Sequence, residues 1–216
     1  LGGHHSSLNS DEVSDDDSFD AICVGEGEEA VVTLADSLSQ DSKIKSPLLL
    51  KKDIPNLWIR DRITNGVLKN PTGSFKEDLD GPYINRKMWD DWIERPDEYP
   101  SILLGRGCPF KCTFCASHKA HGRDMRYNTV ERVAEDIALM KERYGILGIV
   151  IQDDHFMGGK RRPYDVVKAI HKYDLTMFFQ NALAIYALDY EFLKLLKDSG
   201  VTEIVLPIES GSTHVL

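Results

Sequence analysis

The chain has 216 residues, and its 26 lysines and arginines are outnumbered by 35 aspartates and glutamates, which gives a formal net charge of −9 at pH 7. Hydrophobic residues make up 42% of the sequence and charged residues 28%, a balance that supports a packed core and excludes a wholly disordered chain. No run of about 18 apolar residues occurs, so the sequence predicts no membrane-spanning helix. The acidic balance also argues against a nucleic-acid partner, whose phosphates require a basic face.

The negative charge is concentrated near the N-terminus. Residues 1–50 hold 11 acidic and 2 basic residues, whereas residues 51–216 hold 24 of each. The run Asp15-Asp16-Asp17 within the first segment predicts a solvated loop. The first residue is leucine and not methionine, and we therefore expect the chain to be an internal fragment of a longer protein.

The first 100 residues predict half of a βαβ unit followed by a hairpin. The half unit consists of an apolar strand over residues 21–24, a glycine turn over residues 25–28 and an amphipathic helix over residues 29–38. The pair Asn65-Gly66 favours a tight turn between strands over residues 57–60 and 67–69. Frequent prolines between residues 41 and 100 argue against long helices, so this segment is interpreted as a connector that carries the hairpin.

From residue 101 onward, short apolar strands alternate with amphipathic helices. The predicted strands cover residues 102–104, 148–152, 176–180 and 203–206, and the helices between them begin near residues 128, 163 and 190. Asn128 and Glu131 have the spacing of a capping pair for the first of these helices. Pro207 cannot donate to a strand ladder, which brings the continuation of the last strand into question.

Consecutive parallel strands with helical crossovers predict an α/β sheet or barrel. An eightfold β/α barrel needs about 250 residues. The 109 residues from Cys108 to Leu216 are enough for about half of one.

Three of the four cysteines lie within eight residues, in the sequence Cys108-Pro-Phe-Lys-Cys112-Thr-Phe-Cys115. Thiolates favour zinc or iron–sulfur clusters, and so close a group without a signal peptide favours a reducing cytoplasm over a disulfide framework. A closed zinc site needs four ligands, whereas three cysteines on an iron–sulfur cube leave one iron open for a small molecule. A zinc site completed by His118 or His121 is the alternative.

The CxxxCxxC spacing with an aromatic residue before the last cysteine resembles the signature of the radical S-adenosylmethionine (SAM) enzymes. Further segments resemble the cobalamin-dependent branch of that family, namely Gly105 to Cys115, Asp153-Asp154-His155-Phe156, Glu209-Ser210-Gly211-Ser212, Leu1 to His4 and Gly25 to Glu28. The resemblance implies the N-terminal half of a TIM-like β/α barrel, preceded by the C-terminal remnant of a Rossmann-like cobalamin-binding domain. The expected segments are 1–40 for the remnant, 41–100 for the connector and 101–216 for the half barrel.

The resemblance also assigns ligands. Cys108, Cys112 and Cys115 would hold a 4Fe–4S cluster. The residues expected at SAM are Phe114, Asp153, Asp154, Gln180, Glu209 and Ser210, and those expected at cobalamin are Gly2, Gly3, Gly25 and Gly27. The polar residues among them follow predicted strands. This placement independently supports a role in the active site, because β/α barrels form their active sites at the carboxyl ends of the strands.

The implied activity is reductive cleavage of SAM at the cluster, which starts radical chemistry on an unidentified small molecule. Methyl transfer from cobalamin or a rearrangement would follow, and an electron donor such as flavodoxin or ferredoxin is the implied partner. Two alternatives remain. One is a radical SAM methylthiotransferase-like enzyme without cobalamin, and the other is a zinc-stabilised binding module without catalysis.

Overall fold

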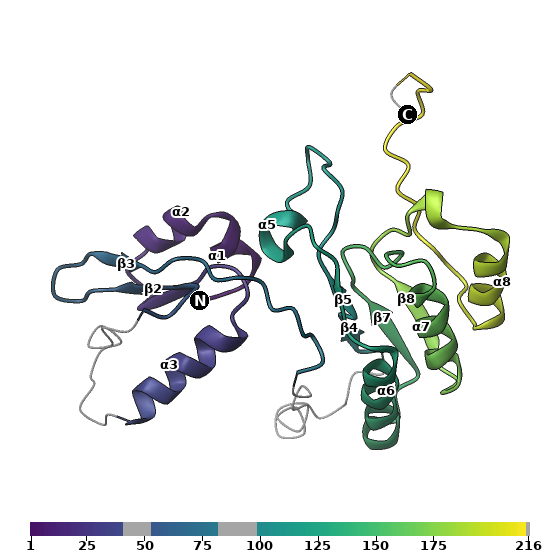
Figure 1. Ribbon diagram of the computed structural model, residues 1–216, viewed down its shortest axis with the longest axis horizontal. Helices are drawn as coiled ribbons and strands as arrows, with labels where there is room; N and C mark the ends of the chain where they lie inside the picture. The colour runs from purple at the N-terminus through teal and green to yellow at the C-terminus, as the bar shows by residue number, and fades with distance from the viewer. Residues whose placement is uncertain (41–52, 82–98, 215–216) are drawn as a thin grey trace. The chain divides into compact units, whose positions relative to one another are not determined.

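The computed structural model describes residues 1–40, 53–81 and 99–214, which form two compact units (Figure 1). The first unit comprises Leu1–Glu77 and Cys108–Arg123, and the second comprises Asp78–Gly107 and Asp124–Leu216. Within the described ranges, every helix is too short or too polar to cross a membrane.

The first unit is built on an antiparallel sheet. Strand β1 (Ala21–Cys23) pairs with β2 (Leu57–Arg60), which pairs in turn with β3 (Val67–Lys69). The helices of this unit are α1 (His4–Leu8), α2 (Ser10–Asp15), α3 (Glu28–Gln40) and α5 (Ser117–His121). A small core contains the buried residues Cys23, Ala30, Ile54, Leu57 and Ile59.

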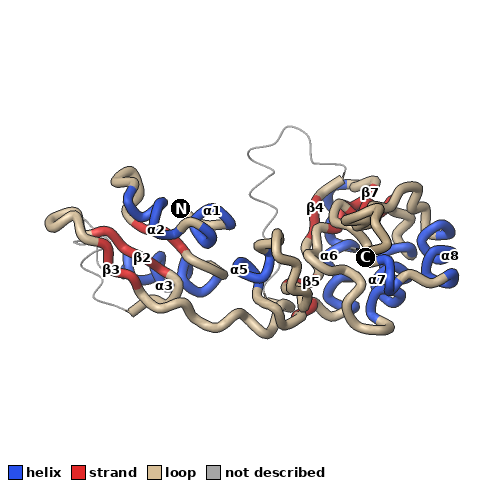
Figure 2. Tube along the Cα trace, turned by 90° about the horizontal axis from the view of Figure 1, so that it is seen from above, coloured by secondary structure: helices blue, strands red, loops and turns tan. Residues whose placement is uncertain are grey.

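The hairpin predicted at Asn65-Gly66 is confirmed, and Figure 2 shows β2 and β3 side by side. Asn65 has φ of 55°, in the left-handed region that asparagine tolerates better than most residues. The Asp61 carboxylate accepts the N–H groups of Ile63 and Thr64 at 2.7 and 3.2 Å, which fixes the turn. Because β2 also pairs with β1, the hairpin belongs to the same sheet as the strand that precedes it in the chain.

The second unit contains a parallel sheet with the strand order β4 (Ser101–Ile102), β7 (Gly148–Ile151) and β8 (Thr176–Phe179). A separate antiparallel pair is formed by β5 (Gly105–Arg106) and β6 (Arg126–Tyr127). The helices are α6 (Val130–Tyr144), α7 (Arg162–His171) and α8 (Tyr190–Asp198), with the 3-10 helix η2 (Ile185–Ala187) before α8. The predicted α/β class is confirmed.

The helices cover one face of the parallel sheet. Ile149 and Ile151 of β7 and Met177 and Phe179 of β8 are 0% to 4% exposed. They share one core with apolar residues of α6 and α7, namely Val133, Ile137, Met140, Val166, Val167 and Ile170. The side chain of Phe178, between two of these core residues, is 37% exposed. Since side chains alternate along a strand, the described residues leave the second face of the sheet open.

The first residue of α6 is set by a different cap from the one predicted. The Thr129 hydroxyl accepts the N–H of Arg132 at 3.1 Å, so Thr129 is the N-cap. The predicted capping role of Asn128 is wrong, because its side-chain amide donates to the carbonyl of Leu79 at 2.7 Å. The prediction was thus one residue early at this helix.

The fourth strand predicted over residues 203–206 is absent from the described part of the chain. The carbonyl of Val205 accepts the N–H of Leu183 at 2.9 Å, which is one isolated bond toward the segment after β8. The N–H of Ile208 donates to the carbonyl of Leu206 at 3.0 Å, so the main chain turns tightly around Pro207 and leaves the extended path. Three parallel strands therefore stand where four were predicted, and they form no closed barrel.

Adjacent substitutions in β7 test whether the helices cover one face of the sheet. Ile151 is 1% exposed, and Ile151→Ala should lower the free energy of unfolding of the full-length protein by about 2–5 kcal/mol through the cavity it leaves. Val150 is only half-buried, and Val150→Ala should cost about 1 kcal/mol or less. Urea denaturation followed by circular dichroism measures both losses. Equal losses would mean that both faces are packed alike.

Candidate functional site

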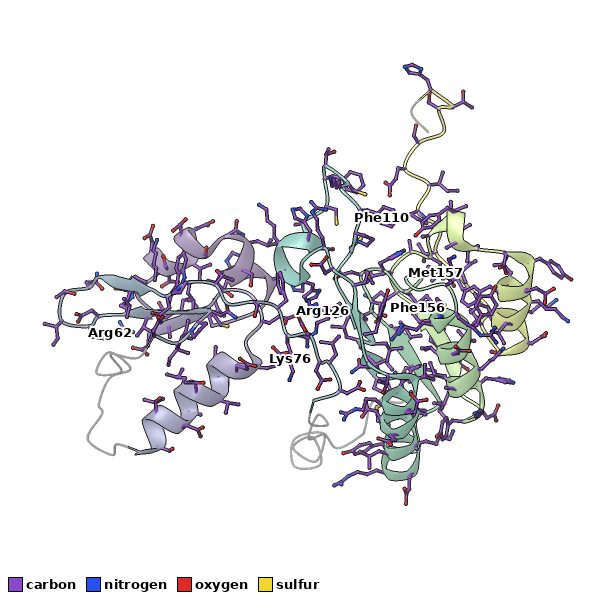
Figure 3. The ribbon with its side chains drawn as sticks, in the orientation of Figure 1. Arg62, Lys76, Phe110, Arg126, Phe156 and Met157 are labelled. Atoms are coloured by element: carbon purple, nitrogen blue, oxygen red, sulfur yellow. The ribbon has the colours of Figure 1, made fainter. Side chains whose placement is uncertain are left out.

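The three clustered cysteines lie on a closed loop, Cys108–Arg123, that belongs to the first unit. The N–H of Cys108 donates to the carbonyl of Gly122 at 3.2 Å and closes the base of this cysteine loop. Gly122 has φ of 77°, and a Cβ there would lie 2.7 Å from the ring of Phe75, so glycine is required on both grounds. The carbonyl of Phe110, a residue labelled in Figure 3, accepts a hydrogen bond from Arg123 that ties the loop to its own base.

The cysteines of the cysteine loop form no disulfide bond and differ in exposure. Cys108 and Cys115 are half-buried and Cys112 is exposed. The rings of Phe110 and Phe114 are 42% and 72% exposed, so the loop presents apolar surface beside its thiols. Across the described residues, no three side chains of histidine, cysteine, aspartate or glutamate gather closely enough to hold a metal ion.

The chemistry of the donor set nonetheless fits an iron–sulfur cluster, because three thiols on one short loop are soft ligands for iron. The zinc alternative required a fourth ligand from His118 or His121. The ring of His121 packs edge-on against the ring of His4, with 5.5 Å between centroids. This contact engages the ring of one of the two candidate fourth ligands.

The four glycines expected at cobalamin lie around the carboxyl end of β1. A Cβ on Gly2 would lie 3.7 Å from the Cβ of Cys23, and one on Gly27 would lie 3.1 Å from its sulfur. Gly3 and Gly25 have φ of 92° and 93°, and the N–H of Gly25 donates to the Ser7 hydroxyl at 2.9 Å. The structure therefore brings these four positions together within the first unit.

Asp153, at the end of β7, is 2% exposed and serves the main chain of its own unit. Its Oδ1 accepts the N–H of Leu104 at 2.6 Å, while its Oδ2 is buried without a partner among the described residues. Burial raises the pKa of Asp153 to about 6, an effect opposed by the main-chain N–H bonds and by the charge of Arg162. The neighbouring Asp154 is half-buried.

Amide side chains connect the ends of the parallel strands. Gln152 donates to the hydroxyl of Ser101 at 2.7 Å and to the side-chain oxygen of Gln180 at 2.8 Å. Asn181 donates to the main-chain carbonyls of Gln152 and Asp153 at 3.1 and 3.0 Å, and so secures the turn after β7. Gln180 itself is exposed at the end of β8.

Glu209 and Ser210 lie outside any regular element. Glu209 is exposed, and the half-buried Ser210 accepts the N–H of Ser212 at 3.1 Å through its hydroxyl. Since the strand predicted before them is not formed, the structure does not place them on a strand end.

Several polar residues near the strand ends were not among the predicted site residues. Arg162 donates to the carbonyl of Leu104 at 2.7 Å and lies over the ring of Tyr127. His155 is 6% exposed, its Nε2 lies 3.2 Å from the Tyr186 hydroxyl, and burial lowers its pKa. One sequence signal could have indicated Arg162, because a cation in the first turn of a helix opposes the helix dipole.

The two residues that follow His155 are part of the hydrophobic core of the second unit. Phe156 and Met157 are 3% and 7% exposed (Figure 3). The ring of Phe156 packs edge-on against that of Phe179 of β8, with 4.9 Å between centroids. The segment after β7 is thus held by apolar packing as well as by hydrogen bonds.

Comparison with known families gives a match to the radical SAM superfamily over residues 102–216, just over half of the chain. The matched range contains the three loop cysteines together with β7 and β8.

Two curated relatives match almost the whole chain. The uncharacterized methyltransferase PH0819 of Pyrococcus horikoshii is 27% identical over 198 residues, which cover 92% of this chain and 42% of that protein. The cytidylyl-2-hydroxyethylphosphonate methyltransferase of Streptomyces wedmorensis is 23% identical over 244 residues, which cover 100% of this chain and 45% of that protein. The chain therefore spans less than half the length of these relatives.

A solved structure shows the same fold. The cobalamin-dependent S-adenosylmethionine radical enzyme OxsB, with aqua-cobalamin and S-adenosylmethionine bound, superposes with a TM-score of 0.70 at 19% identity. The match covers 100% of this chain and 31% of that one. The predicted partial fold is thereby confirmed.

Asp153 gives the second unit a pH dependence of defined sign. Its pKa is about 6 when folded and about 3.9 when unfolded, so the folded state binds the proton more tightly. The stability that this group contributes is present below about pH 4 and is lost as the pH rises through 6. Asp153→Asn keeps an oxygen for the Leu104 N–H but cannot ionise.

We expect the Asn variant and the wild type to be about equally stable near pH 4, and the variant to be more stable by up to about 3 kcal/mol near pH 7.5. Urea denaturation of both proteins across this range gives the difference. The difference between the two free energies of unfolding is free of the contributions of other carboxylates, which are the same in both proteins. A difference that does not change with pH would contradict the raised pKa of Asp153.

Proposed function

The chain belongs to the radical SAM superfamily, and on that premise we propose that its full-length protein is a cobalamin-dependent radical SAM methyltransferase that acts on a small molecule. The observation that carries the proposal is the family match across the loop with the CxxxCxxC spacing. The two methyltransferases that match nearly the whole chain support methyl transfer, and the cobalamin bound in OxsB supports that cofactor.

The cysteine loop would supply the cluster ligands. Cys108, Cys112 and Cys115 would hold a 4Fe–4S cluster, and this cluster with SAM bound supplies the reductive cleavage that starts radical chemistry. The chain's own part is to present the thiolates and to keep water away. The exposed rings of Phe110 and Phe114 lie on either side of Cys112 in the sequence and are suited to shield the site.

Asp154 is a better candidate than Asp153 for the ammonium group of SAM. Asp153 is buried, and one of its oxygens is already bound by Leu104. Alternation along β7 sends Ile149 and Ile151 to the covered face and the residues between them to the other face. Continued past the strand, this alternation groups the half-buried Asp154 with the open face.

The exposed amide of Gln180 lies at the end of the neighbouring strand and would contribute a further polar contact to SAM. Glu209 and Ser210 would contribute only if the segment after α8 orders around the cofactor, because it holds no strand here. These two assignments rest on the resemblance of the sequence alone.

Of the four glycines around the end of β1, Gly3 has open space where a Cβ would stand, whereas Gly2, Gly25 and Gly27 lie against other atoms of the chain. Gly2, Gly3, Gly25 and Gly27 present no side chains there, and two of them use positive φ that only glycine adopts readily. We assign cobalamin to this end of the first unit. Residues 1–40 would then be the last part of the cobalamin-binding domain, followed by the connector and the half barrel.

A cluster of this kind needs an external reductant. A small electron-transfer protein such as flavodoxin or ferredoxin would fill this role. Clustered cysteines that form no disulfide are typical of a reducing compartment, and we therefore assign the protein to the cytoplasm.

Iron analysis tests the cluster. The full-length protein reconstituted under anaerobic conditions should contain about four iron and four sulfide per chain. Replacing Cys108, Cys112 or Cys115 by Ala should abolish most of this content. Cys23→Ala is the matched control, because Cys23 is buried in β1 and lies outside the loop, and it should retain the full cluster.

Two further outcomes separate the alternatives. One tightly bound zinc without iron would reject the proposal in favour of a binding module. Cobalamin retention, read from the visible absorption of the full-length protein, separates a methyltransferase from a methylthiotransferase-like enzyme. A protein that binds iron but retains no cobalamin would still be a radical SAM enzyme, and the cobalamin-dependent methyltransferase would be rejected.

Substitution of the two aspartates tests the SAM assignment. An ammonium–carboxylate hydrogen bond contributes roughly 1.5–3 kcal/mol, so Asp154→Asn should weaken SAM binding about ten- to hundredfold without loss of iron. Asp153→Asn, the matched control at the adjacent position, should show a much smaller change. Equilibrium dialysis with reconstituted protein measures both affinities, and unchanged binding in the Asp154 variant would remove this residue from the site.

A further inference from the structure

A buried polar cluster holds the main chain just before the cysteine loop. The N–H of Leu104, four residues before Cys108, donates to Asp153 at 2.6 Å. The carbonyl of Leu104 accepts from Arg162 at 2.7 Å and from the N–H of Asn128 at 3.0 Å. Segments from β7, from α7 and from the region after β6 thus meet at one peptide position.

Arg162 contacts both stems of the loop. The stem that enters the loop, residues 101–107, contains β5, and the stem that leaves it, residues 124–128, contains β6; the two strands pair through Gly105 opposite Tyr127 and Arg106 opposite Arg126. The guanidinium group of Arg162 lies 4.2 Å from the ring centroid of Tyr127. One side chain of α7 therefore binds the first stem through the Leu104 carbonyl and the second through an aromatic face.

Tyr127 has little freedom to move. A Cβ at Gly158 would lie 1.9 Å from its hydroxyl, and a Cβ at Gly105 would lie 2.8 Å from its ring. The ring thus fills the space between two glycines, one of which belongs to the first stem. Close packing of this kind makes the platform under the guanidinium rigid.

The placement of Arg162 is costly for the fold. It is in the first turn of α7, where a cation opposes the helix dipole. Its Nε and Nη1 are buried without a hydrogen-bond partner among the described residues. Buried unpaired donors destabilise a protein, and local conflicts of this kind are typical of functional positions.

We propose that Arg162 is a positioning residue that fixes both stems of the cysteine loop, the segments of the second unit from which the loop departs and to which it returns. The inference rests on the proposed function, which gives the loop its cluster. Arg162 would not contact the cofactor. It acts through Leu104 and Tyr127.

The first experiment needs no cofactor. Hydrogen exchange by mass spectrometry compares the cluster-free full-length wild type with Arg162→Met, which keeps length but removes charge and donors. We expect exchange in the peptides of both stems, residues 101–107 and 124–128, to become about tenfold faster or more. Exchange in α8 should stay unchanged, and Arg162→Lys, which retains a cation, should restore part of the protection.

The neighbouring Arg161→Met is the matched control, because Arg161 is exposed and precedes the helix. It should exchange like the wild type. Equal acceleration in the stems and in α8 would show general destabilisation and overturn the proposal. Unchanged exchange in the stems would overturn it as well.

The second experiment uses reconstituted protein. Arg162→Met should keep its iron and sulfide content but show an altered electron paramagnetic resonance signal of the reduced cluster with SAM. Cleavage of SAM should slow about ten- to hundredfold, as expected when reacting groups are slightly misplaced. If the variant has the same resonance signal and the same rate of SAM cleavage as the wild type, the positioning role is rejected and the proposed function is not. If the wild type itself contains no iron, the proposed function is rejected.

Discussion

The alternation of side chains along β7 is the constraint on which the second unit depends. Ile149 and Ile151 face the helices and join the core, and the same parity carries Asp153 to the buried side. On the buried side the Asp153 carboxylate is shielded from water and accepts the N–H of Leu104. One strand therefore builds the core and also provides the acceptor that holds the chain ahead of the cysteine loop.

Much of this architecture could be predicted because its signals are local. The apolar strands and the amphipathic helices depend on residues within a few positions of one another, and so does the Asn65-Gly66 turn. The prediction failed where it had to choose between two adjacent residues and the choice depends on a residue far away in the sequence. Asn128 and Thr129 are both good capping residues, and Thr129 takes the role because the Asn128 amide is bound by Leu79, 49 positions away.

In the candidate site, too, features set by neighbouring residues could be predicted, and features set by distant contacts could not. The three cysteines are close in sequence, so their spacing alone predicts a shared site for zinc or an iron–sulfur cluster, and the resemblance to a family was needed to choose between them. Asp153 and Asp154 look equivalent in the sequence, and the structure separates them by burial, because Asp153 is 2% exposed and accepts the N–H of Leu104 whereas Asp154 is half-buried. Arg162 lies 58 positions from Leu104, and its single trace in the sequence is a positive charge at the wrong end of a helix.

Tyr127 leaves its glycine neighbours no room to change. A methyl group at position 158 would overlap its hydroxyl, and one at position 105 would overlap its ring. A larger residue at either position therefore requires a smaller one at 127, and that change would uncover the guanidinium of Arg162. The four positions are therefore coupled by packing, and a substitution at one of them changes which residues the other three can accommodate.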